Sequence, residues 1–201
     1  MKRWVTLGAA AALAGAGLVG SRASAESDQV TAVLRDPGGT VVGLVTFAGD
    51  GRGTRVTAVL RPNRYVAADQ FHGFHVHAND NPSNGSGCLA DPAQPPSTWF
   101  LSADAHLARA GEMHGEHAGD MPSVLVTSRG LAVLGFVTTR FTPAAVVGRA
   151  IVLHAGPDNF GNVPVGTAPD QYTPNSPAAT DKTHATGNSG DRVACGVARR
   201  V

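Results

Sequence analysis

The sequence predicts an all-β fold, a sandwich or a barrel, in a chain of 201 residues. Short runs of Val, Leu, Thr and Phe alternate with polar residues, and turn-forming residues separate these runs at near-regular spacing. The chain contains 25 Gly and 13 Pro, and no stretch shows the long periodic pattern of a helical bundle or coiled coil. The length fits one domain, so the strands are expected to share one core.

Eight strands are expected. The first three are separated by tight turns such as Asp36–Gly39, which indicates an antiparallel sheet. The fifth and sixth flank Arg129-Gly130 and are predicted to form a hairpin. The predicted ranges are Gln29–Arg35, Thr40–Ala48, Thr54–Leu60, Phe71–His77, Val124–Thr127, Leu131–Thr138, Arg149–Leu153 and Arg192–Val197.

Two long segments, 78–122 and 155–191, lack periodicity and are rich in Gly, Pro, Asn and Asp. No helix is predicted in either. Loops of this length are uncommon in a compact domain and usually carry function. We therefore expect the functional site to lie in these two loops.

The N-terminus predicts a secretory signal peptide over residues 1–25. Lys2-Arg3 precedes an apolar run from Trp4 to Gly20, and Ala23-Ser24-Ala25 supplies the small residues that signal peptidase recognises. A membrane anchor is the alternative, but the run is short for a span and rich in Ala and Gly. Residues 26–201 are thus expected to form one domain, secreted or held in the periplasm or cell envelope, with no membrane span.

The charge balance argues against nucleic acid as a partner. The chain has 16 Lys plus Arg and 15 Asp plus Glu, a formal net charge of +1. Removing the leader removes three basic residues and no acidic residue, so the net charge becomes −2. A protein that neutralises phosphates needs a basic excess, which this chain lacks.

Cys88 and Cys195 are the two cysteines of the chain. Export would expose them to oxidising conditions, where an even number permits one disulfide. Such a bond would close a loop of roughly 100 residues and stabilise the fold by about 4–5 kcal/mol. Two buried free thiols are the alternative.

His75 and His77 are the first candidate metal ligands. Residues two apart on a strand share a face, so these imidazoles point one way while Phe74 and Val76 point into the core. Two such side chains can converge on one ion, although a surface His pair is the commoner explanation.

A second group of candidates lies in the first long loop, and a third follows an apolar strand. The loop group consists of His106, His114, His117 and Asp120. Three imidazoles and one carboxylate suit a closed tetrahedral zinc site. His154 ends the strand Arg149–Leu153, and Asp158 beyond it is a carboxylate that could orient a ligating imidazole.

Four segments now form a combined pattern. They are His72-Gly73-Phe74-His75-Val76-His77, Gly119-Asp120-Met121-Pro122, His154-Ala155-Gly156 with Asp158-Asn159, and Gly190–Val197. In this order they resemble the copper/zinc superoxide dismutase family, over about Val30 to Val197. The resemblance implies an eight-stranded flattened Greek-key β-barrel, an immunoglobulin-like sandwich, with both metals held outside it by the two long loops.

The resemblance also implies roles for single residues. The copper ligands would be His75, His77, His106 and His154. The zinc ligands would be His106, His114, His117 and Asp120, with His106 shared as a bridging imidazolate. Asp158 would link a copper ligand to a zinc ligand, Cys88 and Cys195 would form the family's disulfide, and Arg192 would lie beside the copper.

The implied function is an exported superoxide dismutase with one copper and one zinc per chain. It would convert superoxide into oxygen and hydrogen peroxide by copper(II)/copper(I) cycling, with His106 relaying a proton and Arg192 guiding the anion. The alternative is a non-catalytic exported protein that buffers copper or zinc on the same scaffold. Arg192 favours the enzyme, because a buffer has no need of it.

Two features depart from the family pattern. Only two residues separate His114 from His117, which leaves a copper-only enzyme open. The long, Pro-containing stretch between Cys88 and His106 is interpreted as an ordinary surface loop. A homodimer and a monomer both stay open. The remaining histidines are expected to be structural (His72, bonded to backbone) and solvated (His184).

Overall fold

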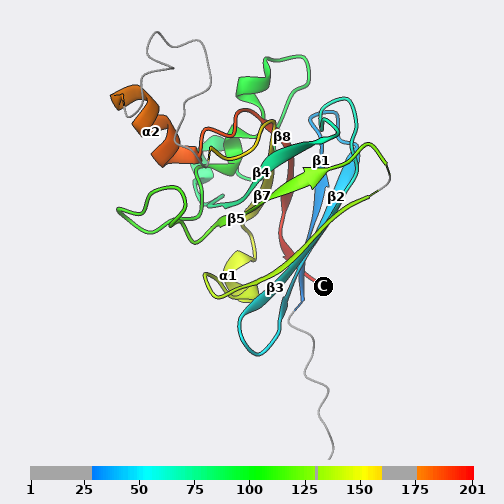
Figure 1. The fold of residues 1–201 in the computed structure, drawn as a ribbon, viewed down its shortest axis with the longest axis vertical. Helices are drawn as coiled ribbons and strands as arrows, with labels where there is room; N and C mark the ends of the chain where they lie inside the picture. Colours follow the sequence, from blue (N-terminus) through cyan, green and yellow to red (C-terminus); the bar gives the residue numbers. More distant parts are fainter. Residues whose placement is uncertain (1–28, 130, 160–175) are drawn as a thin grey trace, which may run out of the picture.

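The computed structural model describes residues 29–129, 131–159 and 176–201, and these form a mainly antiparallel sheet structure (Figure 1). The predicted signal peptide lies outside the described residues. None of the helices within the described ranges has the length and apolar character needed to cross a membrane. The strands are β1 (Val30–Arg35), β2 (Val41–Gly49), β3 (Thr54–Leu60), β4 (Gln70–His77), β5 (Asp120–Val126), β6 (Ala132–Thr138), β7 (Ala150–His154), β8 (Arg192–Val197) and β9 (Arg199–Arg200).

Eight of these strands form a nearly closed Greek-key barrel, which confirms the predicted fold class. Hydrogen bonds join them in the order β5-β4-β7-β8-β1-β2-β3-β6, and all the pairs are antiparallel. The two-residue β9 pairs with β1 in addition. Alternate side chains fill the interior, where the largest fully buried apolar residues are Phe47, Phe74, Leu34, Leu60, Ile151 and Leu153.

The predicted hairpin between Val124 and Thr138 is wrong. β5 pairs with β4 and β6 pairs with β3, so these consecutive strands lie at opposite ends of the hydrogen-bonded order. The link between them therefore brings the two edges of the sheet together, as a closing barrel requires. β5 also begins earlier than predicted, at Asp120, where it pairs with His75.

Both long loops contain helices that the sequence did not predict. The first holds three 3₁₀ helices, η1 (Pro82–Asn84), η2 (Pro96–Thr98) and η3 (Leu101–Ala103), and the second holds α2 (Pro177–Thr186). Helix α2 is almost without an amphipathic pattern, so hydrophobic periodicity could not reveal it. A further helix, α1 (Pro143–Val146), connects β6 to β7. Residues 160–175 of the second loop lie outside the described ranges.

The first long loop is packed against the barrel through a second apolar cluster, so its middle is not an ordinary surface loop. The disulfide between Cys88 and Cys195 joins this loop to β8, as predicted. The indole N–H of Trp99 donates to the carbonyl oxygens of Asp91 (2.9 Å) and Gln94 (3.1 Å). The buried members of the cluster are Trp99, Phe100, Ala103, Ala150, Val152 and Cys195.

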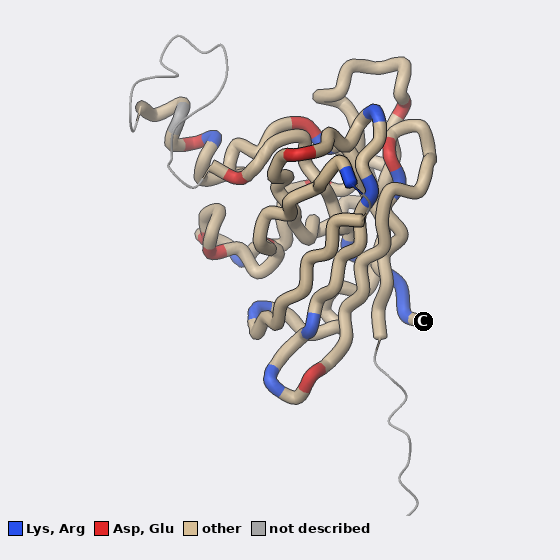
Figure 2. Tube along the Cα trace, turned by 45° about the vertical axis from the view of Figure 1, so that its right-hand side comes forward, with Lys and Arg blue, Asp and Glu red and all other residues tan. Residues whose placement is uncertain are grey.

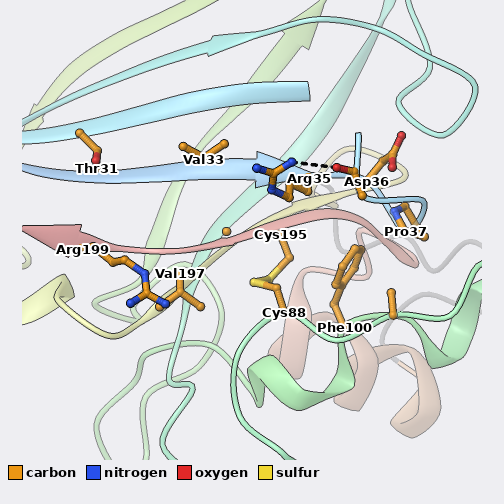
Figure 3. A pocket seen from close by; sticks show the side chains of 13 residues that line it. Thr31, Val33, Arg35, Asp36, Pro37, Cys88, Phe100, Cys195, Val197 and Arg199 are labelled. Atoms are coloured by element: carbon orange, nitrogen blue, oxygen red, sulfur yellow. Dashed lines mark hydrogen bonds between the residues drawn. A yellow bond between two sulfur atoms is a disulfide. The ribbon is translucent and has the colours of Figure 1, made fainter. Parts of the chain in front are cut away.

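Figure 3 shows the disulfide beside a surface groove of about 450 Å³ that β1, β8 and the first loop enclose. Arg35 and Arg199 border this groove, and Nη1 of Arg35 donates to the carbonyl oxygen of Gly39 at 2.9 Å. Figure 2 shows that most charged residues lie in loops and turns, which leaves the strands largely uncharged.

Candidate metal centre

Strand alternation places two imidazoles on the outer face of β4. Phe74 and Val76 point into the barrel core, as predicted, and His75 and His77 therefore point outward. The long loops cover this outer face, and the two imidazoles are 0% and 1% exposed. The site thus lies outside the barrel and away from water.

Backbone pairing fixes the position of His106 beside β4. An isolated β-bridge pairs His77 with His106, and the N–H of Leu107 donates to the carbonyl oxygen of Val76 at 2.8 Å. Gly119 lies against the same segment, where a Cβ atom would be 2.2 Å from the Val76 carbonyl oxygen. Only glycine permits this close approach, which lets the loop return to β5.

The register between β7 and β8 places His154 opposite Arg192. These two residues are partners across the ladder, at the ends of their strands. Nδ1 of His154 lies 3.1 Å from the carbonyl oxygen of Gly190, and Nδ1 of His77 lies 2.7 Å from that of Asp104. A carbonyl oxygen accepts only, so both rings carry a proton on Nδ1 and present an unprotonated Nε2.

Four buried imidazole nitrogens converge without a hydrogen-bond partner among the described residues. The four residues have ligand atoms within 4.8 Å of one another. Burial, followed by the neighbouring imidazoles, holds the pKa of His75, His77 and His154 well below the usual range, so these rings are neutral. Neutral imidazoles offer lone pairs, and an all-imidazole set suits copper. The unpartnered atoms are His75 Nδ1, His77 Nε2, His106 Nε2 and His154 Nε2.

A second set of ligand atoms surrounds Asp120. Its Oδ1 lies 2.9 Å from Nδ1 of His106, 3.3 Å from Nδ1 of His114 and 3.4 Å from Nδ1 of His117. The Nδ1 atoms of His106 and His117 are 3.3 Å apart. Ligands of a tetrahedral zinc ion are separated by about 3.3 Å, given bonds of about 2.0 Å. The two-residue spacing between His114 and His117 is therefore compatible with a zinc ion.

Asp120 carries the negative charge of the second set, because its carboxyl group is ionised at neutral pH. Burial raises its pKa, but hydrogen bonds with His106 and His114 outweigh burial and hold the pKa well below the usual range. The ligand atoms of His75, His106, His114 and Asp120 all lie within 4.8 Å of one another, and this group does not include His117. We assign His75 to the first set because its Nε2 contacts Asp158 and only its Nδ1 is unpartnered.

Asp158 lies between the two sets. Its Oδ1 is 2.9 Å from Nε2 of His75 and 3.6 Å from Nε2 of His114, and burial raises its pKa. The hydroxyl of Ser123 donates to Oδ2 of Asp158 at 2.9 Å, a contact that the sequence analysis missed. One carboxylate thereby orients one imidazole of each set.

Arg192 is held by two backbone carbonyl groups. Its Nη1 donates to the oxygen of Phe100 at 2.5 Å and its Nη2 donates to the oxygen of Asp104 at 2.7 Å. Burial lowers the pKa of Arg192, which nevertheless remains a cation at neutral pH. The sequence did not predict either partner, because every residue has a backbone carbonyl and its residue type does not show which one accepts a hydrogen bond.

The last two histidines behave as predicted. The ring nitrogens of His72 lie 2.6 Å and 2.9 Å from the carbonyl oxygens of His154 and Ala67, so its role is structural. His184 is exposed on α2. Its carbonyl oxygen accepts a hydrogen bond from the backbone N–H of His114 at 2.7 Å.

The comparisons with known proteins agree with this geometry. The chain is 33% identical over 182 residues to "Superoxide dismutase [Cu-Zn]" of Mycolicibacterium paratuberculosis, covering 87% of this chain and 76% of that protein. It is 32% identical over 179 residues to "Superoxide dismutase [Cu-Zn] 2" of Brassica juncea, covering 83% and 93%. The fold is similar to that of the Cu/Zn superoxide dismutase from Brucella abortus, with a TM-score of 0.58 and 22% identity over 84% of this chain and 98% of that one.

A family match covers most of the chain. The family described as copper/zinc superoxide dismutase (SODC) matches residues 41–198, which include all the predicted metal-ligand positions and both cysteines. The alternative of a non-catalytic buffering protein is not favoured by these relatives. On the family match and the identity to its curated members, the chain belongs to the copper/zinc superoxide dismutase family.

Proposed function

We propose that this chain is an exported superoxide dismutase whose copper is held by His75, His77, His106 and His154. The observation that carries the proposal is the convergence of four buried, unpartnered imidazole nitrogens at the strand end that bears Arg192. Copper bound by these residues would supply one-electron redox chemistry between copper(II) and copper(I), which is what the conversion of superoxide into oxygen and hydrogen peroxide requires.

His106 is the proton relay in this proposal. Its Nε2 belongs to the first set, while its Nδ1 lies 2.9 Å from Asp120 in the second set. One ring nitrogen therefore faces the reacting anion and the other is anchored. Peroxide needs two protons to leave as hydrogen peroxide; in this proposal Nε2 of His106 holds and releases one, and solvent supplies the other.

Arg192 guides superoxide to the site. Its guanidinium is a permanent cation that two carbonyl oxygens hold in one orientation. The remaining N–H groups can donate to a small anion. A fixed positive charge raises the local anion concentration even where removal of residues 1–25 would leave a net charge of −2.

Metal analysis together with activity tests this function. The purified protein is expected to hold about one copper per chain and to dismutate superoxide, and His75→Ala is expected to lose the copper and at least about a hundredfold of the activity. His184→Ala is the matched control, because that imidazole is exposed and should leave both quantities unchanged. Copper bound without any dismutation by the wild-type protein would contradict the proposal.

The second set, His106, His114, His117 and Asp120, is the proposed zinc site. Arg140 supports its short loop, as Nη1 donates to the carbonyl oxygen of His117 (3.0 Å) and Nη2 to that of Gly115 (2.8 Å). Zinc bound by these residues would hold the shared imidazole without changing its own redox state.

Replacing Arg140 by alanine is therefore expected to weaken zinc binding about 10- to 100-fold, because the loop that aligns His114 and His117 loses both hydrogen bonds. Competition with a zinc chelator measures the affinity. Arg109→Ala removes an exposed arginine from the same loop. Its guanidinium pairs with Glu112 at 3.5 Å, and this variant should bind zinc like the wild type. Equal zinc affinity in Arg140→Ala would show that the loop needs no such support.

Export rests on the leader-like residues 1–25 together with the disulfide, which is typical of oxidising compartments. Expression in a bacterial host with fractionation is expected to place the protein outside the cytoplasm. N-terminal sequencing should then begin at Glu26. Recovery of the uncleaved chain in the cytoplasm, with its cysteines reduced, would refute export.

A further inference from the structure

Asp104 has a backbone conformation that side-chain-bearing residues avoid. Its φ is 65° and its ψ is −161°, a combination found almost only for glycine. It lies at the C-terminal end of η3, two residues before the candidate ligand His106. Such a conformation persists only where the surroundings fix it, and strain of this kind gathers at functional sites.

The Asp104 carboxylate supplies that fixation. Its Oδ2 accepts hydrogen bonds from the backbone N–H groups of Asp80 (2.8 Å) and Asn81 (3.0 Å), and its Oδ1 accepts one from Nδ2 of Asn84 (2.5 Å). All three donors come from one turn at residues 80–84. That turn is itself tied to the barrel, because Nη1 of Arg149 donates to Oδ2 of Asp80 at 2.8 Å.

The strained conformation determines where the Asp104 carbonyl points. Its oxygen accepts from Nδ1 of His77 (2.7 Å) and from Nη2 of Arg192 (2.7 Å). The other carbonyl that holds Arg192 belongs to Phe100, which also has a positive φ of 56°. Two non-glycine residues in unfavoured conformations, at the two ends of η3, thus aim their carbonyl groups at one guanidinium.

We propose that Asp104 is a positioning residue for Arg192: the carboxylate, clamped by the turn at 80–84, holds the backbone so that the carbonyl oxygen orients the guanidinium. The inference deepens the proposed function, since it rests on Arg192 as the guide for superoxide. Without the clamp, residue 104 relaxes toward the ordinary extended region and its carbonyl turns away. Arg192 then keeps one carbonyl partner instead of two.

Three variants at position 104 separate the clamp from the strain. Asp104→Ala removes the clamp at a residue that disfavours this conformation, whereas Asp104→Gly removes the clamp at a residue that adopts it freely. Asp104→Asn keeps a side-chain oxygen for the backbone donors of the turn. Asp91→Ala is the matched control: that carboxylate lies on the same loop and accepts the N–H of Ala93 at 2.9 Å, away from Arg192.

Two measurements read out the position of Arg192. The first is the affinity of the copper-loaded protein for azide, a small anion, followed by absorption spectroscopy. The second is NMR of the Arg192 guanidinium in the metal-free protein. Its signal is assigned by its loss in Arg192→Lys. A guanidinium held by hydrogen bonds rotates slowly. The second measurement needs no metal, so it tests the clamp even if the dismutase proposal fails.

Azide affinity is expected to fall about tenfold in Asp104→Ala and Asp104→Gly, the effect of losing one hydrogen bond to a charged group. The Arg192 guanidinium should rotate freely in both. Asp104→Asn should stay within about twofold of the wild type, and Asp91→Ala should match it. If Asp104→Ala does not fold, Asp104→Gly decides. Wild-type azide affinity together with slow guanidinium rotation in Asp104→Gly would overturn the proposal. A loss of azide affinity in Asp104→Asn as large as that in Asp104→Ala would also overturn it.

Discussion

The metal-free protein is expected to lose stability steeply as the pH falls below about 6.5. Burial holds the pKa of His75, His77, His154 and His106 below 6.5, whereas the same residues titrate near 6.5 in the unfolded chain. Above this pH these four histidines are neutral in both states, and their contribution to stability is fully present. Below it only the unfolded chain takes up these protons, so the folded state becomes relatively less stable until the pH reaches the folded pKa values.

The size of this effect follows from proton counting. Each proton bound only by the unfolded state lowers the free energy of unfolding by about 1.4 kcal/mol per pH unit. Four histidines act in this direction. His114, whose pKa is raised, acts against them only above pH 6.5, because below that pH it is protonated in both states. Below pH 6.5 the slope therefore approaches four protons, or about 5.5 kcal/mol per pH unit.

Denaturant unfolding of the metal-free protein at about pH 7.5, 6.5 and 5.5 measures this slope. His184→Ala is the control, because an exposed imidazole should leave the slope unchanged. Protein loaded with both metals should show a shallower dependence over this range, since a ligating nitrogen cannot bind a proton. An equally stable metal-free protein at all three pH values would contradict the neutral, buried state of these histidines.

Removing the disulfide is expected to lower the free energy of unfolding by about 4–5 kcal/mol. The bond joins residues 107 positions apart, so its loss restores a large conformational freedom to the unfolded chain. The double variant Cys88→Ser/Cys195→Ser should show this loss in denaturant titrations. Reduction of the wild-type bond should give a similar loss by an independent route.

A control for local packing is available on the same loop. Leu89, beside the disulfide, is 56% exposed, and Leu89→Ala should change stability by less than about 1 kcal/mol. A double serine variant as stable as the wild type would show that the folded loop, rather than the covalent bond, determines stability. Either result also bears on the site, because the loop closed by Cys88 carries His106.

The strands were predictable because short apolar or alternating runs lie between turn-forming residues. β3 and β8 have the predicted bounds, and β4 has the predicted faces. The pairing of β5 and β6 was not predictable, because a turn between two apolar runs does not reveal whether they join one ladder or close a barrel. Helix α2 was not predictable for a different reason, since it has almost no apolar face.

The candidate ligands were predictable because imidazole and carboxylate groups are rare enough to stand out at family spacings. Their supporting contacts were not. Asp104 and Phe100 act through carbonyl oxygens, which every residue has, and Arg140 reaches the zinc loop from the connection after β6. Only the folded chain brings these atoms together, and the unusual backbone angle at Asp104 has no counterpart in its residue type.

β7 is buried on both faces, and this has a consequence for how the molecule opens. Ile151 and Leu153 face the barrel interior, while Ala150 and Val152 face the cluster beneath the first loop. β7 thus contributes side chains to both apolar cores. The first loop cannot separate from the barrel without exposing the outer face of this strand to water. Segments joined in this way unfold as one cooperative unit. The loop that contributes His106, irregular as it is, therefore belongs to the rigid body of the protein and presents its ligand already in place.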